Sequence, residues 1–137
     1  MWLVYALLSA IFAALVSILA KIGMQNINSN LAVAIRTIVV LITAWMLVFA
    51  IGKHGDISSL TQKNWIFLIL SGFATALSWL FYFKALQIGE ASKVIPVDKM
   101  SVVFGIVLAF MFLNETITLK TILGGILIVL GTIILAL

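Results

Sequence analysis

The sequence contains very little charge. Asp, Glu, Lys and Arg together make up 9% of its 137 residues, whereas 65% of the residues are hydrophobic. A soluble domain typically has about 25% charged residues, and a globule of this size has too much surface for its volume to bury so many apolar side chains. The composition therefore excludes an ordinary soluble globular protein and indicates an integral membrane protein.

Cysteine is absent, and the chain has one histidine and four carboxylates. Without cysteine, disulfides, thiolate metal sites and thiol nucleophiles are excluded. One histidine and four carboxylates offer little for a metal site or a hydrolytic triad, so we expect no metal, no cofactor and no enzymatic activity. The Lys and Arg residues are spread between apolar segments rather than clustered, which argues against a nucleic-acid partner.

Five segments are long and apolar enough to cross a bilayer, which requires about 20 mostly apolar residues. They are residues 3–20, 31–51, 65–83, 94–113 and 119–137. The connectors are short and polar, and none could hold a soluble domain. The sequence predicts an all-α integral membrane protein in which residues 1–137 form a single domain of five transmembrane helices. No Lys or Arg precedes the first apolar stretch, so we expect a membrane span there and not a cleaved signal peptide.

Polar and small residues mark the ends of these spans. Asn64 and Thr118 are candidate N-caps, because their side chains can accept a hydrogen bond from a free N–H of the first turn. Gly52 and Gly55 fit the turn that follows the second span. These residues predict helix boundaries that the structure can test.

Positive charge is divided evenly between the two faces of the membrane. We call the face of the N-terminus face A, and the face reached by the first and third connectors face B. Each face carries three connector cations, and counting the embedded Arg36 and Lys99 tilts the balance weakly toward face B in the cytoplasm. A single fixed orientation and insertion in both orientations both stay open.

Three charged residues fall inside the apolar spans: Arg36, Asp98 and Lys99. A charge at the centre of a membrane helix costs about 2.5–3.5 kcal/mol, so such residues usually have a function. Arg36 lies roughly 7.5 Å and Asp98 roughly 6 Å into their spans, at 1.5 Å per residue. Both spans enter from face B, so the five-helix topology predicts a similar depth for all three charges.

Two cations and one carboxylate favour an anionic or zwitterionic ligand over a simple cation. We therefore expect a ligand with a carboxylate or phosphate, with Asp98 as a candidate for proton coupling. Two simpler interpretations stay open, since Lys99 can extend to the headgroups and Asp98 can be a structural ion-pair partner. Pro96 lacks an N–H and is expected to disturb or kink the helix just before the charged pair.

Polar residues also line single faces of several spans. Ser71, Thr75, Ser78 and Tyr82 are spaced by four, three and four residues, and Asp98 and Ser101 share a face of the next span. These stripes predict a narrow polar cavity, in which Trp79 and Tyr82 stack against a bound group. Such hydroxyls also often bond back to their own helix. Gly124, Gly125 and Gly131 in the last span instead indicate close packing or dimerisation.

From residue 82 the chain reads Y-F-K-A-L-Q-I-G-E-A-S-K-V-I-P-V-D-K-M-S, followed by F-L-N-E and G-G-I-L-I-V-L-G. These motifs contain an aromatic before A-L, an early Pro in the fourth span, a Glu after that span and paired glycines in the fifth. With them the chain resembles, over essentially its whole length, the EamA branch of the drug/metabolite transporter superfamily. S-W-L-F-Y and the Arg36-Thr37 start of the second span fit the five-helix, half-length members.

The resemblance implies a carrier that works by alternating access. Full-length relatives have ten helices in two halves of inverted topology, so this chain would be one half and would need an antiparallel partner, either a second copy or a similar half-size chain. Its size also resembles that of small multidrug resistance proteins. Those proteins rely on a carboxylate in the first helix, and residues 3–20 contain none, so their exchange of cations for protons is not carried over.

We therefore expect a multi-pass membrane transporter for a small metabolite that acts as a dimer. The candidate substrate-binding residues are Arg36, Ser78, Trp79, Tyr82, Asp98, Lys99 and Ser101. The alternatives are a flippase for a phosphate-linked lipid and a non-transporting membrane subunit. Scrambling of lipid without uptake of soluble solutes would favour the first alternative, and tolerance of neutralised Arg36 and Lys99 would favour the second.

Overall fold

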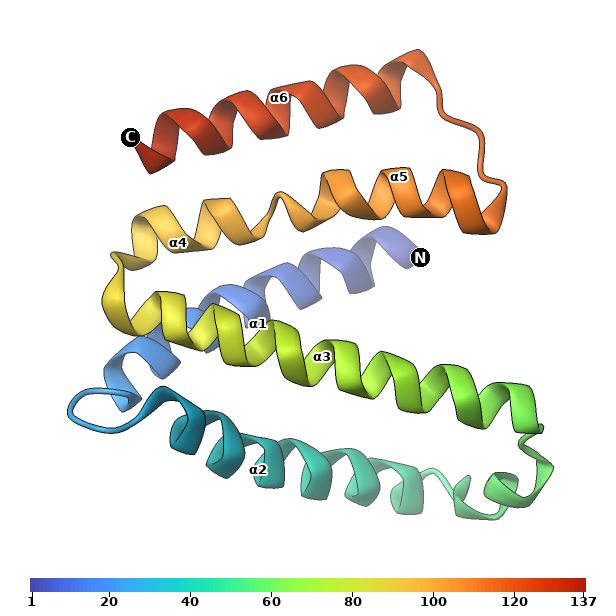
Figure 1. The fold of residues 1–137 in the computed structure, drawn as a ribbon. Coiled ribbons are helices and arrows are strands. Elements are labelled where there is room, and N and C mark those ends of the chain that lie inside the picture. Colours follow the sequence, from blue (N-terminus) through green and yellow to red (C-terminus); the bar gives the residue numbers. More distant parts are fainter. The chain divides into compact units, whose positions relative to one another are not determined.

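The computed structural model describes residues 1–137, and the chain is almost entirely helical (Figure 1). The helices are α1 (Trp2–Gly23), α2 (Ser29–Ala50), the 3₁₀ helix η1 (His54–Ser59), α3 (Gln62–Ile88), α4 (Ala91–Asp98), α5 (Ser101–Leu113) and α6 (Leu119–Ala136). Five helical segments are long and apolar enough to span a membrane, with α4 and α5 together forming one of them. The prediction of an all-α protein with five spans is confirmed.

The third span is longer than its apolar stretch predicted. α3 begins at Gln62, and Thr61 rather than Asn64 caps it, because Thr61 Oγ1 accepts a hydrogen bond from Asn64 N at 3.3 Å. The Asn64 side chain instead accepts a hydrogen bond from Thr61 Oγ1 at 2.9 Å. The prediction of Asn64 as the N-cap was therefore wrong. The helix extends through the polar residues Gln62 and Lys63 because the Thr61 side chain caps it further toward the N-terminus. The prediction of Thr118 is confirmed, as its side chain accepts from Thr121 N.

The ends of α2 are defined by two local motifs. At its start, Asn28 Oδ1 accepts a hydrogen bond from Asn30 N at 2.8 Å. At its end, Gly52 has a φ of +69°, and the N–H groups of Gly52 and Lys53 donate to Phe49 O and Val48 O. This pair of bonds is a Schellman motif, in which a left-handed residue lets the chain turn back on the last helical carbonyls. The predicted turn at Gly52 is confirmed.

The chain forms two compact units. Unit 1 comprises Met1–Ile18 and Ile88–Leu137, so it holds most of α1 with α4, α5 and α6. Unit 2 comprises Leu19–Gln87, with the last residues of α1, then α2, η1 and α3. Each unit has its own way of holding its helices together.

Unit 2 has a small core of large, buried apolar side chains: Met24, Val33, Phe83 and Leu86. Polar groups connect the three helices around this core. Lys21 Nζ donates to Leu86 O at the end of α3, and Gln87 Nε2 donates to Ile27 O at 2.6 Å. These bonds satisfy carbonyls that a helix end or a turn leaves without a backbone partner.

Unit 1 buries small residues instead. Ser17, Gly125 and Thr132 are buried, whereas no large apolar side chain of this unit is. α6 packs on α4 and, less extensively, on α5, and Lys93 Nζ donates to Leu137 O at 3.3 Å. A Cβ added at Gly124, Gly125 or Gly131 would meet no atom within 4 Å, so the chain itself does not pack closely on these glycines. The alternative of a dimerisation face stays a prediction.

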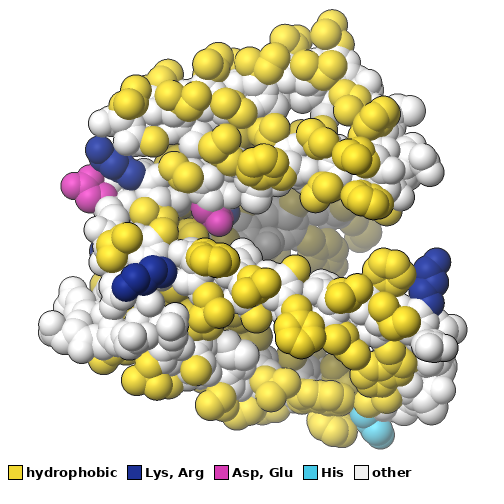
Figure 2. All heavy atoms as spheres, viewed as in Figure 1, with side chains coloured by type: hydrophobic (Ala, Val, Ile, Leu, Met, Phe, Trp, Pro, Cys, Tyr) yellow, Lys and Arg dark blue, Asp and Glu magenta, His cyan; other side chains and the backbone are white.

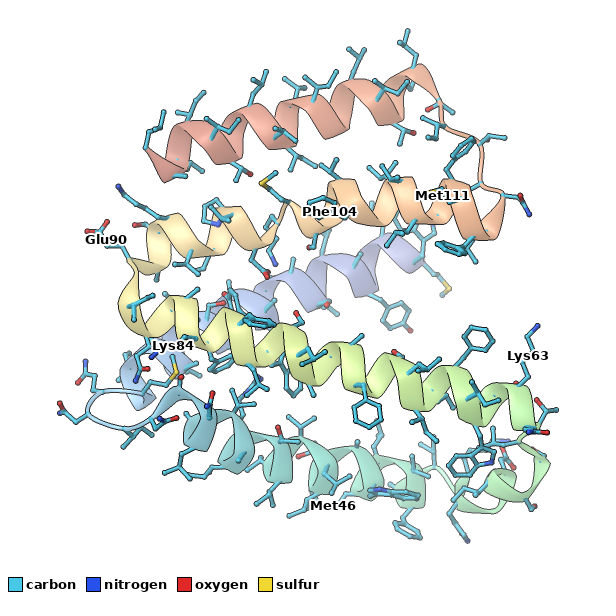
Figure 3. The ribbon with its side chains drawn as sticks, viewed as in Figure 1. Met46, Lys63, Lys84, Glu90, Phe104 and Met111 are labelled. Carbon is cyan, nitrogen blue, oxygen red and sulfur yellow. The ribbon has the colours of Figure 1, made fainter.

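Most large apolar side chains of both units are exposed. Figure 2 shows hydrophobic side chains over most of the visible surface and few charged ones. On α3, Lys63 and Lys84 lie near opposite ends of the helix, and Phe104 and Met111 extend from α5 (Figure 3). Lipid tails are as apolar as these side chains, so this surface suits the interior of a bilayer.

Candidate functional site

The Arg36 guanidinium of unit 2 lies over two aromatic rings. Its Cζ is 4.5 Å from the ring centroid of Trp79 and 4.7 Å from that of Phe83. Trp79 and Phe83 are four residues apart on α3, so their rings extend from the same face of that helix. A cation within about 6 Å of a ring centroid is attracted by the negative face of the ring. The two rings therefore hold the side chain of Arg36 in a defined position.

The guanidinium nonetheless has an unsatisfied donor. Nη1 of Arg36 is buried and has no hydrogen-bond partner, and no carboxylate of unit 2 forms an ion pair with it. A buried charged donor left without a partner is costly, and native structures rarely contain one without a functional reason. Arg36 lies about 10 Å along α2 from its start at Ser29, at 1.5 Å per residue. The structure thus places an unpaired cation inside a membrane-spanning helix.

Both predicted stacking residues, Trp79 and Tyr82, lie beside other side chains of unit 2. Trp79 faces Arg36, and Tyr82 packs edge-on against Phe83 with 5.8 Å between ring centroids. Phe83, which is 1% exposed, was not among the residues predicted from the sequence. Its spacing of four residues from Trp79 is the signal that could have identified it. Two aromatic rings therefore hold the candidate cation, and stacking of Trp79 or Tyr82 against a bound group stays a prediction.

The charged pair of unit 1 lies at a break between two helices. α4 ends at Asp98 and α5 begins at Ser101, and the Asp98 carboxylate lies 3.5 Å from Lys99 Nζ. Neither the carbonyl of Asp98 nor the N–H of Ser101 forms a backbone hydrogen bond across the break. Pro96 lies inside α4, two residues before its end, and its missing N–H would have bonded within α4, to the carbonyl of Ser92. The helix continues through Pro96 to Asp98, so the break comes after the charged pair begins, and a kink at Pro96 stays a prediction.

Thr132 of α6 contacts this interrupted helix directly. Its Oγ1 donates to the carbonyl of Pro96 at 3.2 Å, and its side chain is among the few buried polar ones, at 5% exposed. Thr132 was not among the residues predicted from the sequence. A single hydroxyl in the otherwise apolar second half of the last span was the available signal. The bond connects α6 to α4 just before the Asp98–Lys99 pair.

Several hydroxyls of the membrane-spanning helices are satisfied within their own helices. Ser17, Thr43 and Thr75 each donate to the carbonyl four residues earlier, at 2.8–2.9 Å, and Thr75 belongs to the predicted stripe of α3. Ser78 and Ser101 are exposed. Bonding of a hydroxyl to its own helix was the simpler interpretation of the polar stripes. A hydroxyl bonded in this way has no free O–H to donate to a ligand. A cavity built by the stripes stays a prediction.

The candidate residues thus fall into two groups. Arg36, Trp79, Tyr82 and Ser78 belong to unit 2, and Asp98, Lys99 and Ser101 belong to unit 1. Within each unit the structure brings Arg36 to Trp79 and Asp98 to Lys99. The similar depth of Arg36 and Asp98 stays a prediction from topology.

The whole chain matches the model of the EamA-like transporter family, over residues 1–137. The chain belongs to the EamA-like transporter family. It is similar to an uncharacterized transporter of Sinorhizobium sp, with 44% identity over 135 residues that cover 98% of this chain and 96% of the relative. No solved structure matches.

A second relative is similar over a shorter segment. It is an uncharacterized protein of Methanocaldococcus jannaschii, 32% identical over 84 residues that cover 61% of each chain. Family membership and the five apolar helices make this chain a multi-pass membrane protein of a transporter family. The resemblance inferred from the fourth and fifth spans is confirmed.

Proposed function

We propose that this protein is a secondary transporter for a small anionic or zwitterionic metabolite and that it works by alternating access as a dimer. The observation that carries the proposal is the Arg36 guanidinium, which two aromatic rings hold inside a membrane-spanning helix while its Nη1 has no partner. A carboxylate or phosphate oxygen would supply the missing acceptor. The family supports transport in general, and Arg36 supports the class of substrate.

Arginine suits this task because its planar guanidinium can donate two parallel hydrogen bonds to one carboxylate or phosphate. Contacts with Trp79 and Phe83 restrict its rotamers before the ligand arrives, so less conformational entropy is lost on binding. The residues assigned to face B carry five cations against two carboxylates, and those assigned to face A carry three cations against two. The excess of positive charge on face B would attract the same class of ligand.

The size of the chain supports the dimer in this proposal. A single chain supplies five spans, and the family resemblance implies that two such halves of opposite orientation form one carrier. The even division of connector cations between the two faces fits a chain that inserts in both orientations. Because the chain has no cysteine, single cysteines added at either end and labelled from each side of the membrane would determine the orientation.

The Arg36 proposal is tested with purified protein reconstituted in vesicles and a panel of labelled carboxylates, phosphates, amino acids and organic cations. The native protein should accumulate at least one anionic or zwitterionic compound. Arg36→Gln should lower that uptake about 30-fold or more, since removing one partner of a buried charged hydrogen bond costs about 2–5 kcal/mol. Arg36→Lys should recover only part of it, because lysine lacks the planar fork.

Lys63→Gln is the matched control, because it also removes one cation but lies near the start of α3, far along that helix from Trp79. Uptake of an anion by Arg36→Gln at the native rate would refute the role of Arg36. Uptake of organic cations alone would refute the substrate class while leaving a transporter in place.

Asp98 is our candidate for proton coupling. It pairs with Lys99 at the break between α4 and α5, where its side chain is 35% exposed. Asp98→Asn should abolish accumulation driven by a proton gradient while substrate exchange between equal concentrations continues. Gradient-driven accumulation by this variant at the native rate would exclude the coupling role.

The second candidate is a flippase for a phosphate-linked lipid. It is favoured by a groove of about 320 Å³ between α5 and α6, which Thr121 and nine apolar or glycine residues line, among them Val103, Val107 and Gly125. Such a groove could accept an acyl chain. Scrambling of a labelled phospholipid by the reconstituted protein, without uptake of soluble solutes, would favour this function over metabolite transport.

A further inference from the structure

A pocket of about 320 Å³ lies where α2 ends and η1 begins. Its lining residues are Ala44, Trp45, Val48, Lys53, Asp56, Ile57 and Leu60. All belong to unit 2, and none is among the candidate transport residues. The pocket combines an apolar wall on a membrane-spanning helix with one cation and one anion at its rim.

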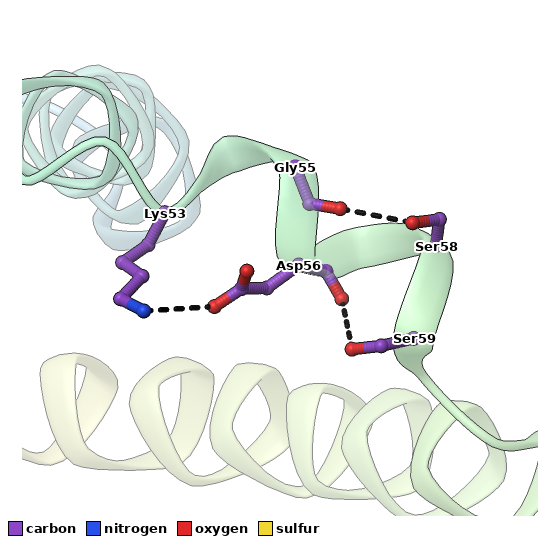
Figure 4. Close-up of polar contacts among 5 residues, drawn as sticks. All are labelled: Lys53, Gly55, Asp56, Ser58 and Ser59. Carbon is purple, nitrogen blue, oxygen red and sulfur yellow. Dashed lines mark hydrogen bonds and ion pairs between the residues drawn. The ribbon is translucent and has the colours of Figure 1, made fainter.

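The segment that forms the rim is held in place by its own hydrogen bonds (Figure 4). Asp56 N donates to Lys53 O at 3.2 Å, Ser58 Oγ donates to Gly55 O at 3.0 Å, and Ser59 Oγ donates to Asp56 O at 2.6 Å. The Schellman motif at Gly52 fixes where this segment leaves α2. The rim therefore exists before any ligand binds.

The two charges of the rim are close but only loosely paired. Lys53 Nζ lies 3.5 Å from Asp56 Oδ2, and each side chain is 66% exposed. A charge-assisted hydrogen bond is shorter, about 2.7–2.9 Å, and exposed ion pairs are weak. Both groups therefore keep the capacity to bind a second partner of opposite charge.

The apolar wall determines where such a partner must come from. Ala44, Trp45 and Val48 lie in the last two turns of α2, so the wall extends about 6 Å along the helix, at 1.5 Å per residue. Tryptophan near a span end is typical of the membrane–water interface. A molecule that reaches both the wall and the rim has an apolar body and a charged end at that interface, as a membrane phospholipid has.

We propose that this pocket binds one phospholipid with an ethanolamine headgroup. The phosphate pairs with Lys53, the primary ammonium donates to Asp56, and the glycerol and the first part of an acyl chain lie along Ala44 and Val48. A headgroup with only negative charge is repelled by Asp56, and choline has no N–H to donate. This site lies outside the proposed transport pathway and does not depend on the substrate or on the dimer.

The test measures lipid binding to the purified full-length protein by native mass spectrometry and by the shift in Tm on lipid addition. The probes are phosphatidylethanolamine, phosphatidylcholine and phosphatidylglycerol with identical acyl chains. Ethanolamine lipid should bind about fivefold more tightly than the other two, the upper range that an exposed ion pair supplies. Asp56→Asn should remove this preference, and Asp56→Glu should restore it.

Two further variants separate the pocket from the general membrane surface. Ala44→Leu should lower binding of all three lipids by filling the wall, whereas Lys63→Met, which removes an exposed lysine outside the pocket, should leave the preference unchanged. Equal binding of the ethanolamine and choline lipids by the native protein would overturn the proposal. Tightest binding of the anionic lipid would also overturn it, because attraction to Lys53 alone would then suffice.

Discussion

The two units of this protein are held together by different means. Unit 2 packs bulky side chains, with Phe83 and Leu86 at 1% and 0% exposed, around an arginine. Unit 1 buries serine, glycine and threonine, and its helices are joined by a side-chain hydroxyl bonded to a backbone carbonyl. Inside a bilayer, packing and hydrogen bonds rather than hydrophobic burial drive helix association. Hydrogen bonds from side chains to backbone carbonyls join the helices of both units, whereas large buried apolar side chains occur in unit 2 alone.

The largest effect should come from removing the central ring of unit 2. Phe83→Ala leaves a cavity and removes one ring from Arg36, so we expect a loss of about 3 kcal/mol in the free energy of unfolding. Phe81→Ala, two residues away and 73% exposed, is the matched control and should have little effect. Thermal unfolding in detergent, followed by circular dichroism, measures both. Equal losses of unfolding free energy for the two variants would contradict the contrast between the units, because the core of unit 2 would then not depend on its buried ring.

The second-largest effect should be a gain in the free energy of unfolding rather than a loss. Arg36→Met removes an unpaired charge that costs about 2.5–3.5 kcal/mol in a membrane helix, and it forfeits two cation–π contacts of roughly 0.5–1 kcal/mol each. We expect the variant to be more stable by about 1 kcal/mol and inactive in uptake. Arg36→Lys should be no more stable than the native protein. A large loss of stability in Arg36→Met would mean that the arginine serves the fold.

A smaller loss is expected in unit 1. Thr132→Val keeps the shape of the side chain and removes the bond to Pro96 O, so the free energy of unfolding should fall by about 0.6–1.7 kcal/mol, the range for hydrogen bonds between membrane helices. Thr132→Ser retains the hydroxyl and should lose less. If valine and serine have the same stability, small-residue packing alone joins α6 to α4.

The smallest effect should come from the glycines of α6. Gly124→Ala and Gly131→Ala place a methyl where no atom of the chain lies within 4 Å, and alanine favours a helix over glycine by up to about 1 kcal/mol. We expect a slight rise in Tm for the monomer. If these glycines face a second copy, chemical cross-linking of the dimer should fall in the same variants. Unchanged cross-linking would exclude this face from the dimer interface.

The sequence predicted the spans well because their signal is simple. Some 20 apolar residues form a membrane helix almost regardless of their order, and Gly52 identified a turn. Pro96 did not locate the break, because α4 continues through it to Asp98. Helix ends were harder, as Asn64 illustrates, because adjacent polar residues compete to cap the same turn. A count of apolar residues also gave no sign of η1. This short helix lies in the polar connector between α2 and α3 and is stabilised by local hydrogen bonds.

The charged residues of the candidate site could be predicted from the sequence. The side chains that contact them were harder to predict. Arg36, Asp98 and Lys99 are conspicuous because charge is rare in a membrane span. The aromatic contacts of Arg36 depend on how α2 and α3 are rotated about their axes, which spacing within one helix does not determine. Thr132 was missed for a related reason. Its partner is the backbone carbonyl of Pro96, and the apolar side chain of Pro96 gives no sign of a polar contact.

The interruption between α4 and α5 has an electrostatic consequence. Each helix has a macrodipole, with about half a positive charge at its N-terminal end and half a negative charge at its C-terminal end. Asp98 is the last residue of α4 and Lys99 follows it, so the negative end of α4 favours the Lys99 cation and disfavours the Asp98 carboxylate. The carboxylate is stabilised instead by Lys99 Nζ, 3.5 Å away. A continuous helix would have no free carbonyl end at this depth, so the break itself helps to make the Lys99 cation tolerable in this part of the chain.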